Sequence, residues 1–158
     1  MFNNCPQPIY GSTVWEGMVP YTDLFIAPGS WNWTYYRNPS VGGTSLKLGL
    51  TDPPTAGPIV QIEYSFADGQ IWYDLSNVDC GVGSQTNKGI CPFTAGGMFL
   101  RFDDEPACAS KTCHPGDDAC KQAYNGPLDD HLAGNTVNYG CPFKGNNMVF
   151  YACADHSL

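Results

Sequence analysis

Apolar and polar residues alternate along several short stretches of the chain, which is the pattern of strands that bury one face. In residues 60–66, apolar side chains at even positions alternate with polar side chains at odd positions. The same period of two recurs in residues 46–50 and 31–35. Further strands are predicted over residues 9–16, 23–27, 70–76, 98–102 and 148–153. Pairs of Gly, Pro, Asn and Asp separate these stretches, so the pattern predicts an all-β sandwich or barrel.

One stretch breaks this alternation. Between residues 103 and 135, acidic residues, three cysteines and turn-forming residues crowd together. At most one short helix is expected, over residues 117–124, with Asp117 near its N-cap. We interpret residues 103–135 as a cysteine-rich loop excursion from the sheets, within a single domain of residues 1–158.

Aromatic residues are concentrated in residues 31–36. Trp31, Trp33 and Tyr35 alternate and would share one face of a strand, with Tyr36 on the opposite face. Such a face either joins the core or forms a platform that stacks on sugar rings. We expect it to join the core, because large aromatic side chains contribute most when they are buried.

The composition narrows the classes of function. The 158 residues are enough for one domain with a substantial core. Seven basic and 15 acidic residues give a net charge of −8, which argues against a nucleic-acid partner. No apolar run approaches the roughly 18 residues that a membrane-spanning helix needs, so no membrane association is expected. We expect a monomer that binds a polysaccharide or a host protein, with no cofactor.

Eight cysteines in a loop-rich chain predict four disulfides and an oxidising compartment. They are Cys5, Cys80, Cys91, Cys108, Cys113, Cys120, Cys141 and Cys153. Eight cysteines allow 105 pairings, so their spacing leaves the partners open. No metal site is expected, because neither the cysteine spacings nor the acidic runs at 103–105 and 129–131 match a known ligand pattern.

The N-terminal residues lack the basic and apolar segments of a signal peptide. Together with the cysteines, this predicts a secreted, extracellular protein in its mature form. One glycosylation sequon, at Asn32, fits that location.

Asp68 and Gly69 separate two predicted strands, which is a strong signal for a two-residue hairpin turn. This register places Glu63 opposite Asp74 on the polar face, with Cβ atoms about 4.5–5.5 Å apart. On the other face it pairs apolar residues only: Phe66 with Ile71, Tyr64 with Tyr73, and Ile62 with Leu75. The register is therefore self-consistent.

Two carboxylates this close repel each other, so they need a nearby cation, a shared proton or a bound ligand. Lys47, on a polar strand face, is the candidate cation. Three interpretations stay open. Glu63 and Asp74 belong to a salt-bridged structural cluster, to an acidic cleft that binds a polar ligand such as a sugar, or to the carboxylate pair of a glycosidase.

Several short segments occur in the same order along the chain as the signature motifs of a known family. They are Asn4-Cys5-Pro6, Thr13-Val14-Trp15, Pro28-Gly29-Ser30-Trp31, Ile62-Glu63-Tyr64-Ser65-Phe66, Tyr139-Gly140-Cys141 and Met148-Val149-Phe150-Tyr151-Ala152-Cys153. Together they resemble the thaumatin-like superfamily. The segment Trp72-Tyr73-Asp74-Leu75-Ser76-Asn77-Val78-Asp79 is most similar to the small fungal branch, the yeast-phase-specific thaumatin-like proteins.

The resemblance implies a thaumatin-like antiparallel β-sandwich with a short disulfide-braced loop region. It also implies a Cys5–Cys153 disulfide and an acidic cleft, in which Glu63, Asp74 and Asp79 match the acidic positions. The family's arginine does not carry over, and Lys47 is the nearest cation on the matching strand. The cysteine-rich region is shorter than the second domain of plant members, so we expect a cleft with one wall missing.

Three functions follow as hypotheses. The first is a non-enzymatic secreted module that binds β-glucan or a related cell-wall polymer, as an antifungal protein or a host-interaction effector. The second is a virulence effector that inhibits a host papain-like cysteine protease or serine protease through a disulfide-braced loop. The third is a weak endo-β-1,3-glucanase with Glu63 as acid and Asp74 as the second carboxylate.

Overall fold

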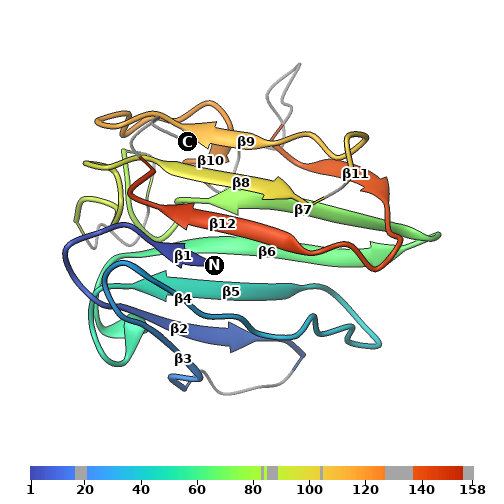
Figure 1. Cartoon of the computed structure of the whole chain (residues 1–158), viewed down its shortest axis with the longest axis horizontal. Coiled ribbons are helices and arrows are strands. Elements are labelled where there is room, and N and C mark those ends of the chain that lie inside the picture. The colour runs from blue at the N-terminus through green and yellow to red at the C-terminus, as the bar shows by residue number, and fades with distance from the viewer. Residues whose placement is uncertain (17–20, 83, 85–88, 104, 127–136, 155–158) are drawn as a thin grey trace.

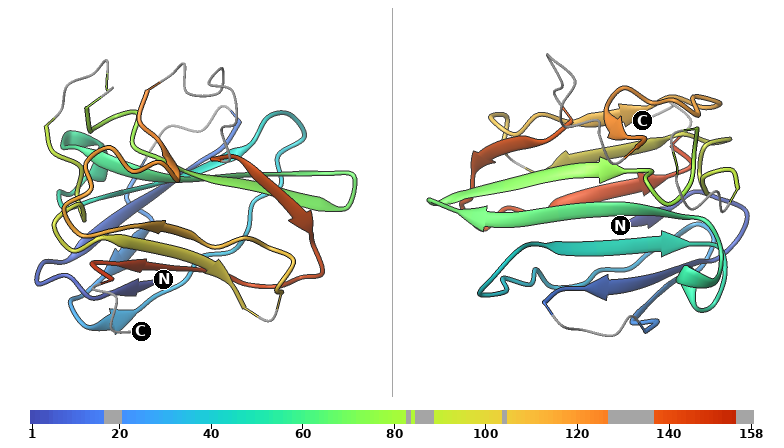
Figure 2. Two further views of the ribbon diagram at one scale, coloured as in Figure 1. Left: turned by 90° about the horizontal axis from the view of Figure 1, so that it is seen from above. Right: turned by 180° about the vertical axis from the view of Figure 1, so that it is seen from behind.

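The computed structural model describes residues 1–16, 21–82, 84, 89–103, 105–126 and 137–154. Two β-sheets stack face to face, as the view from above shows (Figure 1; Figure 2, left). The predicted all-β sandwich is confirmed. In the described residues the helical structure is a 3-10 turn, η1 (Pro54–Ala56), and no helix there is long and apolar enough to cross a membrane.

The strands are mostly antiparallel, with short parallel pairs between β1 and β12 and between β7 and β10. The five-stranded sheet has the order β4 (Ser30–Trp31), β1 (Phe2–Asn3), β12 (Met148–Ala152), β8 (Met98–Phe102), β9 (Lys111–Cys113). The seven-stranded sheet has the order β10 (Ala123–Tyr124), β7 (Gln70–Ser76), β6 (Ile59–Ala67), β5 (Thr44–Gly49), β2 (Ile9–Val14), β3 (Leu24–Ile26), and β11 (Tyr139–Pro142) also pairs with β7.

The β6–β7 hairpin turns at Asp68 and Gly69, with φ of 52° and 73°. Positive φ at both turn residues is the geometry that favours Asp-Gly in a two-residue hairpin loop. The predicted register is confirmed, since Tyr64 pairs with Tyr73 and Glu63 pairs with Asp74. The turn therefore sends the tyrosines to one face of the sheet and the carboxylates to the other.

The core lies between the two sheets and is built from the alternate, apolar positions of the strands. Leu46, Ile62 and Tyr73 of the seven-stranded sheet are buried against Leu100 and Phe150 of the five-stranded sheet. The opposite face of the seven-stranded sheet is left for polar side chains, and the candidate site lies there.

The cysteine-rich region differs from the prediction in two ways. At most one short helix was expected, over residues 117–124, and none forms there; those residues form turns and end in β10, which pairs with β7 at Leu75 and Ser76. Within residues 103–135, β9 and β10 also extend one sheet each, so the described part of this region is not simply an excursion. Both strands form by pairing with strands outside this region, β8 and β7. The local pattern of residues 103–135 contains no signal for such pairing, so it did not predict them.

The aromatic segment is the clearest correction. Trp31, Trp33 and Tyr35 share one side as predicted, but they are 57 %, 66 % and 66 % exposed and do not join the core. Tyr36, on the other side, is the residue that packs against the core. β4 ends at Trp31, so Trp33 and Tyr35 lie beyond the strand, and their side of the chain meets solvent.

Four disulfides join all eight cysteines: Cys5–Cys153, Cys80–Cys91, Cys108–Cys141 and Cys113–Cys120. The first, which the resemblance implied, ties the N-terminal segment to the residue that follows β12. The other three brace the region between β7 and β11.

We expect the Cys5–Cys153 disulfide to contribute most to stability. It spans a sequence separation of 148 residues, against 7 for Cys113–Cys120. Loop-closure entropy predicts a loss of about 5 kcal/mol when both Cys5 and Cys153 become Ser, and about 2.5 kcal/mol for the Cys113/Cys120 pair. Chemical denaturation of the two double variants measures this. Equal losses would contradict the entropic account.

Candidate functional site

An acidic cleft of about 880 Å³ lies on the outer face of the seven-stranded sheet. Its floor consists of side chains that point away from the core, and these lie in three cross-strand rows over β5, β6, β7 and β11. The rows are Lys47–Gln61–Ser76, Ser45–Glu63–Asp74 and Ser65–Trp72–Gly140. Because the strand period is two, the sequence that builds the core also builds this polar floor.

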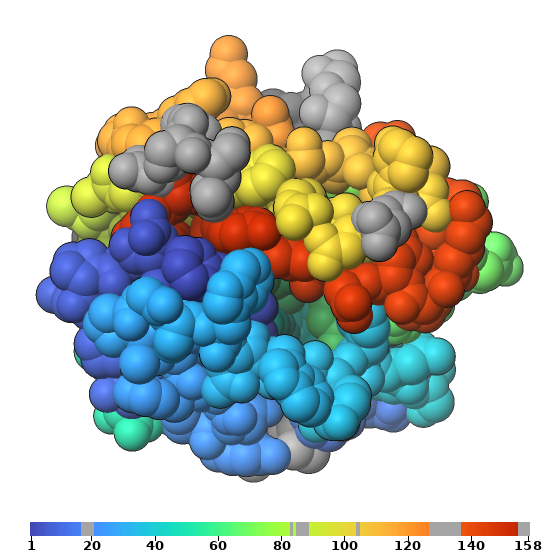
Figure 3. All heavy atoms as spheres, in the orientation of Figure 1, coloured from blue at the N-terminus to red at the C-terminus, as the bar shows by residue number. Residues whose placement is uncertain are grey.

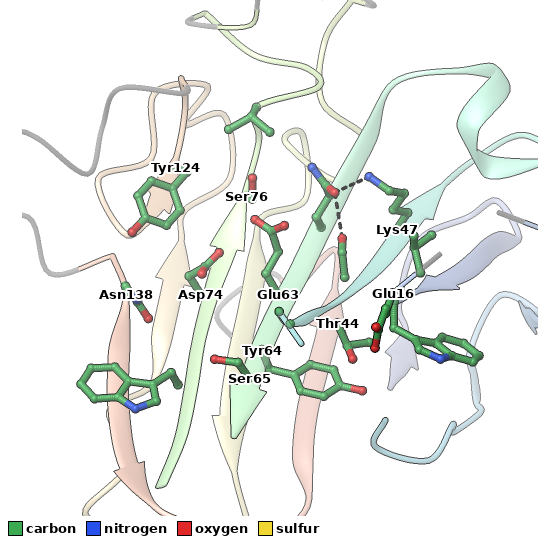
Figure 4. Close-up of a pocket in the computed structure, with 18 of the residues that line it drawn as sticks. Glu16, Thr44, Lys47, Glu63, Tyr64, Ser65, Asp74, Ser76, Tyr124 and Asn138 are labelled. Carbon is green, nitrogen blue, oxygen red and sulfur yellow. Dashed lines mark hydrogen bonds between the residues drawn. The ribbon is translucent and has the colours of Figure 1, made fainter. Parts of the chain in front are cut away.

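Glu63 and Asp74 occupy the middle row and point into the cleft (Figure 4). They project from neighbouring strands, β6 and β7, and both are half-buried. On the other side of β6, Ser45 of β5 is the cross-strand partner of Glu63. The row therefore presents two carboxylates and a hydroxyl from one surface.

Lys47 is held at one end of the floor by Gln61 and Asp79. Its Nζ donates a hydrogen bond of 2.5 Å to Gln61 Oε1 and lies 3.7 Å from Asp79 Oδ2. Gln61 Nε2 donates to the same Asp79 oxygen at 3.2 Å, and Gln61 Oε1 also accepts a hydrogen bond from Ser45. The predicted cation thus pairs with the predicted acid Asp79, and this pair positions Gln61 beside the carboxylate row.

Aromatic side chains flank the floor at both ends, one on β7 and one after β2. Trp72, on β7, is 41 % exposed, and Trp15 follows β2. The Arg37 guanidinium lies 5.2 Å from the centre of the Trp15 ring, a cation–π contact that fixes the indole. Both indoles offer flat apolar surface next to the polar floor.

Gly140 allows Trp72 to lie flat on the sheet. The two residues are cross-strand partners, and a Cβ at Gly140 would lie 2.8–2.9 Å from three atoms of the indole ring. A glycine opposite an aromatic residue is a recurrent way of covering exposed backbone in a sheet. Here the same contact sets how far the indole rises above the cleft.

Part of the cleft wall comes from the cysteine-rich region. Tyr124, the last residue of β10, and Gly126 line the cleft beside Asp74, together with Asn138, which precedes β11 (Figure 4). β10 and β11 share one edge of β7: β10 pairs with Leu75 and Ser76, and β11 with residues 70–73. Asp74 therefore lies at the junction of these two short strands.

Lys111, on β9, is a buried charged residue that the sequence analysis did not single out. It is 3 % exposed, and its Nζ lies 5.9 Å and 5.5 Å from the ring centres of Tyr73 and Tyr139. Burial lowers the pKa of its ammonium group, and the negative charge of Asp74 opposes this effect. Its alternation with Cys113 was the only sequence signal that Lys111 faces inward.

The other residues named from the sequence lie outside the cleft. Asn32, in the glycosylation sequon, is half-buried, and its Nδ2 donates a hydrogen bond to the Phe25 carbonyl. Asp103 pairs with Arg101, and Glu105 with Lys144, whose hydrogen bond holds the pKa of Glu105 below its usual value. Asp104 and residues 129–131 lie outside the described residues. In the part of the chain that the structure describes, no group of three metal-ligating side chains comes together.

Sequence reasoning located Glu63 and Asp74 but missed Gln61, Trp72 and Tyr124. Gln61 could have been found, because it shares the face of Glu63 by the period of two. Tyr124 could not, because its place depends on the pairing of β10 with β7.

We expect Gly140→Ala to displace the Trp72 indole with little loss of stability, because the ring is partly exposed and can move away from the new methyl group. The tryptophan fluorescence emission spectrum of the variant should shift, and the shift should vanish when Gly140→Ala is made in a Trp72→Phe background.

Gly96→Ala is the matched control, because its Cβ would lie 2.5 Å from Cys153 Cβ, which the disulfide holds in place. That variant should lose about 1–3 kcal/mol in denaturation. Equal destabilisation by the two variants would refute the proposed mobility of Trp72.

The cleft combines two kinds of chemical surface. Carboxylates, serine hydroxyls and a glutamine amide supply hydrogen-bonding groups in a plane, and indoles supply stacking surface.

Comparison with known proteins agrees with the fold and the motifs. The family model described as "Blastomyces yeast-phase-specific protein" matches residues 1–154. An "Antigenic thaumatin-like protein" of Arthroderma benhamiae is 35 % identical over 119 residues, which are 75 % of this chain and 52 % of the relative. The "Secreted thaumatin-like protein calA" of Emericella nidulans is 32 % identical over 131 residues, 83 % of this chain and 70 % of the relative. The chain thus spans about half the length of the first of these relatives.

Two solved structures share the fold. The protein elicitor MoHrip2 from Magnaporthe oryzae superimposes with a TM-score of 0.68 at 22 % identity, covering 97 % of this chain and 96 % of the elicitor. The thaumatin-like xylanase inhibitor TLXI gives a TM-score of 0.56 at 13 % identity, covering 96 % of each chain. At these identities the similarity establishes the fold alone.

The expected resemblance is therefore confirmed by sequence and by structure. The four disulfides and the relative named as secreted fit an extracellular location. The family model covers nearly the whole chain, and this protein belongs to the Blastomyces yeast-phase-specific protein family, with a thaumatin-like fold.

Proposed function

We propose that this protein is a non-enzymatic module that binds β-glucan or a related cell-wall polysaccharide in its acidic cleft. The observation that carries the proposal is the polar floor of Ser45, Glu63 and Asp74 next to the exposed indole of Trp72. Sugar hydroxyls donate hydrogen bonds to carboxylates, and such charge-assisted bonds are stronger than neutral ones. The apolar face of a sugar ring stacks on an indole.

The open form of the cleft suits a polymer. The floor runs across several strands from Trp15 beyond β5 to Trp72 on β7, so several sugar units can lie along it. Glu16, exposed at the β2 side, adds a third carboxylate near the end of this path (Figure 4). A chain bound this way needs no reducing end to enter the site.

Binding without hydrolysis is favoured by the direction of the carboxylates. Glycosidases place two carboxyl groups so that they flank the bond to be cleaved. Glu63 and Asp74 project side by side from one sheet face, so both approach a bound polymer from the same side. Asp79 is already engaged by Lys47 and Gln61.

The test is a pull-down on insoluble β-1,3-glucan with Glu63→Gln combined with Asp74→Asn. These changes keep the shape of the side chains and remove both charges. Losing two charge-assisted hydrogen bonds should weaken binding by at least about tenfold. Asp118→Asn, an exposed acid in a different loop, is the matched control and should bind like the wild type.

Two outcomes would reject the proposal. One is no binding of the wild type to glucan, and the other is equal binding by the double variant. Reducing-sugar release from soluble glucan, measured in the same samples, distinguishes the glucanase alternative from binding without hydrolysis. If the wild type releases reducing sugar and the double variant does not, hydrolysis is assigned to this carboxylate pair.

A second candidate function, inhibition of a secreted protease, is supported by one loop. Residues 114–119 are almost all exposed and lie between Cys113 and Cys120, whose disulfide closes the loop. A loop held in one conformation loses little entropy when it enters an active site. One solved structure with this fold is named as an inhibitor, of a xylanase.

If this loop inhibits a protease, Pro115→Ala combined with Asp118→Ala should abolish inhibition, because both side chains lie on its exposed surface. Titration against a papain-like cysteine protease and a serine protease measures this, with the Glu63/Asp74 double variant as the control that keeps inhibition. The absence of inhibition of either protease by micromolar wild-type protein would remove this candidate.

A further inference from the structure

A second cavity, of about 390 Å³, opens between the two sheets. Its inner part is formed by Leu46 and Ile62 of the seven-stranded sheet and by Leu100 and Phe150 of the five-stranded sheet, all buried core residues. Figure 3 shows this face of the molecule hollowed between the light-blue segment that follows β4 and the red β12. The acidic cleft lies on the opposite face of the seven-stranded sheet.

The cavity lies in the gap beside the first half of β12. β1 runs parallel to β12 and pairs with it at Tyr151 and Ala152, whereas the preceding residues of β12, Met148, Val149 and Phe150, line the cavity. Tyr36 occupies part of this gap: its hydroxyl accepts a hydrogen bond from the Met148 N–H at 2.8 Å and donates one to the Asn146 carbonyl at 3.2 Å. These two backbone groups thus have hydrogen-bond partners, but the space beside the Tyr36 side chain is not filled.

Three polar groups among the residues that line the cavity bond within the protein: the α-ammonium of Met1, which donates to the Asn32 carbonyl at 2.8 Å, and the hydroxyls of Tyr36 and Tyr64. The Tyr36 hydroxyl has the two partners just named, and the Tyr64 hydroxyl accepts a hydrogen bond from the Arg37 N–H at 2.8 Å. Burial raises the pKa of both phenols, so both stay neutral. A polyhydroxylated ligand would find these groups already engaged and would lose hydrogen bonds on entering.

The entrance is aromatic. Trp31, Trp33 and Tyr35 line the cavity while more than half of each side chain remains exposed. Trp33 and Tyr35 pack edge to face with ring centres 4.9 Å apart, which holds both rings at the rim. Three large aromatic residues in contact with water at the entrance to an apolar cavity are a surface that a bound apolar molecule would cover.

We propose that this inter-sheet cavity binds a small apolar molecule or the apolar tail of an amphiphile. Its size falls within the range of small-molecule sites, about 300–1,000 Å³. Core side chains form its floor, satisfied hydroxyls its wall and aromatic rings its rim, which is the arrangement that selects for apolar ligands. A fatty acid and a sterol share the required chemistry, and the experiment below distinguishes them. Among the described residues, Tyr64 is the one that lines both this site and the proposed glucan site, and the inference goes beyond that function.

The direct test is titration of the wild-type protein with the fluorescent apolar probe N-phenyl-1-naphthylamine. The expected result is saturable enhancement of its emission with one probe per chain. Decanoic acid and ergosterol are then added separately as competitors, and displacement by one of them identifies the class of ligand. A lack of saturable binding, or displacement by neither competitor, would overturn the proposal.

Trp33→Ala combined with Tyr35→Ala locates the probe. Both residues are exposed, so the variant should fold, and the loss of two rim rings should weaken probe binding by about tenfold. Trp72→Ala, in the acidic cleft, is the matched control and should leave probe binding unchanged. If the rim variant binds the probe like the wild type, or if Trp72→Ala weakens binding equally, the probe lies elsewhere and the assignment is wrong.

The same variants keep this inference separate from the glucan proposal. Glucan pull-down by the Trp33/Tyr35 double variant should equal that of the wild type, and probe binding by the Glu63/Asp74 double variant should be normal. Loss of both activities in either variant would mean that one site serves both ligands, which contradicts two separate sites.

Discussion

The two-residue turn at Asp68 and Gly69 sets the register on which the rest of the sandwich depends. Its left-handed backbone conformation matches the twist of the flanking strands, so β6 and β7 pair in one register only. A slip by one residue would send Glu63 and Asp74 into the core and turn Tyr64 and Tyr73 out to solvent. Burying two unpaired carboxylates would cost far more than the hairpin gains. The core and the acidic face are therefore fixed by the same turn.

Disulfides stabilise the short strands β10 and β11, which strand pairing alone would not hold in place. β10 and β11 are two and four residues long, too short to be stable by themselves, yet both pair with the outer edge of β7. Cys108–Cys141 joins β11 to the cysteine-rich region, and Cys113–Cys120 shortens the path from β9 to β10. The covalent links reduce the entropy lost when these segments become ordered. One wall of the acidic cleft is thereby built from chain that contains little regular structure.

The seven-stranded sheet presents different chemistry on its two faces. On β5 and β6, Lys47, Gln61 and Glu63 point outward to a polar cleft, while Leu46 and Ile62 point inward to an apolar cavity. In the part of the chain that the structure describes, no further layer covers this outer face, and the inner cavity lies beside the first half of β12, ahead of the residues that pair with β1. One alternating sequence thus supplies a hydrophilic surface and a hydrophobic space on the two faces of one sheet, and Tyr64 lines both.

The sequence by itself determined the features that depend on neighbouring residues. The period of two and the Asp-Gly turn predicted the strands, the β6–β7 register and the juxtaposition of Glu63 with Asp74, because these follow from local backbone geometry. Tertiary structure alone decided that Trp31, Trp33 and Tyr35 face solvent, that Lys47 pairs with Asp79, and that Lys111 is buried between two tyrosines. Alternation shows which side chains share a face, but it does not show what covers that face. The covering elements come from distant parts of the chain, and their placement depends on packing and disulfides that no local pattern encodes.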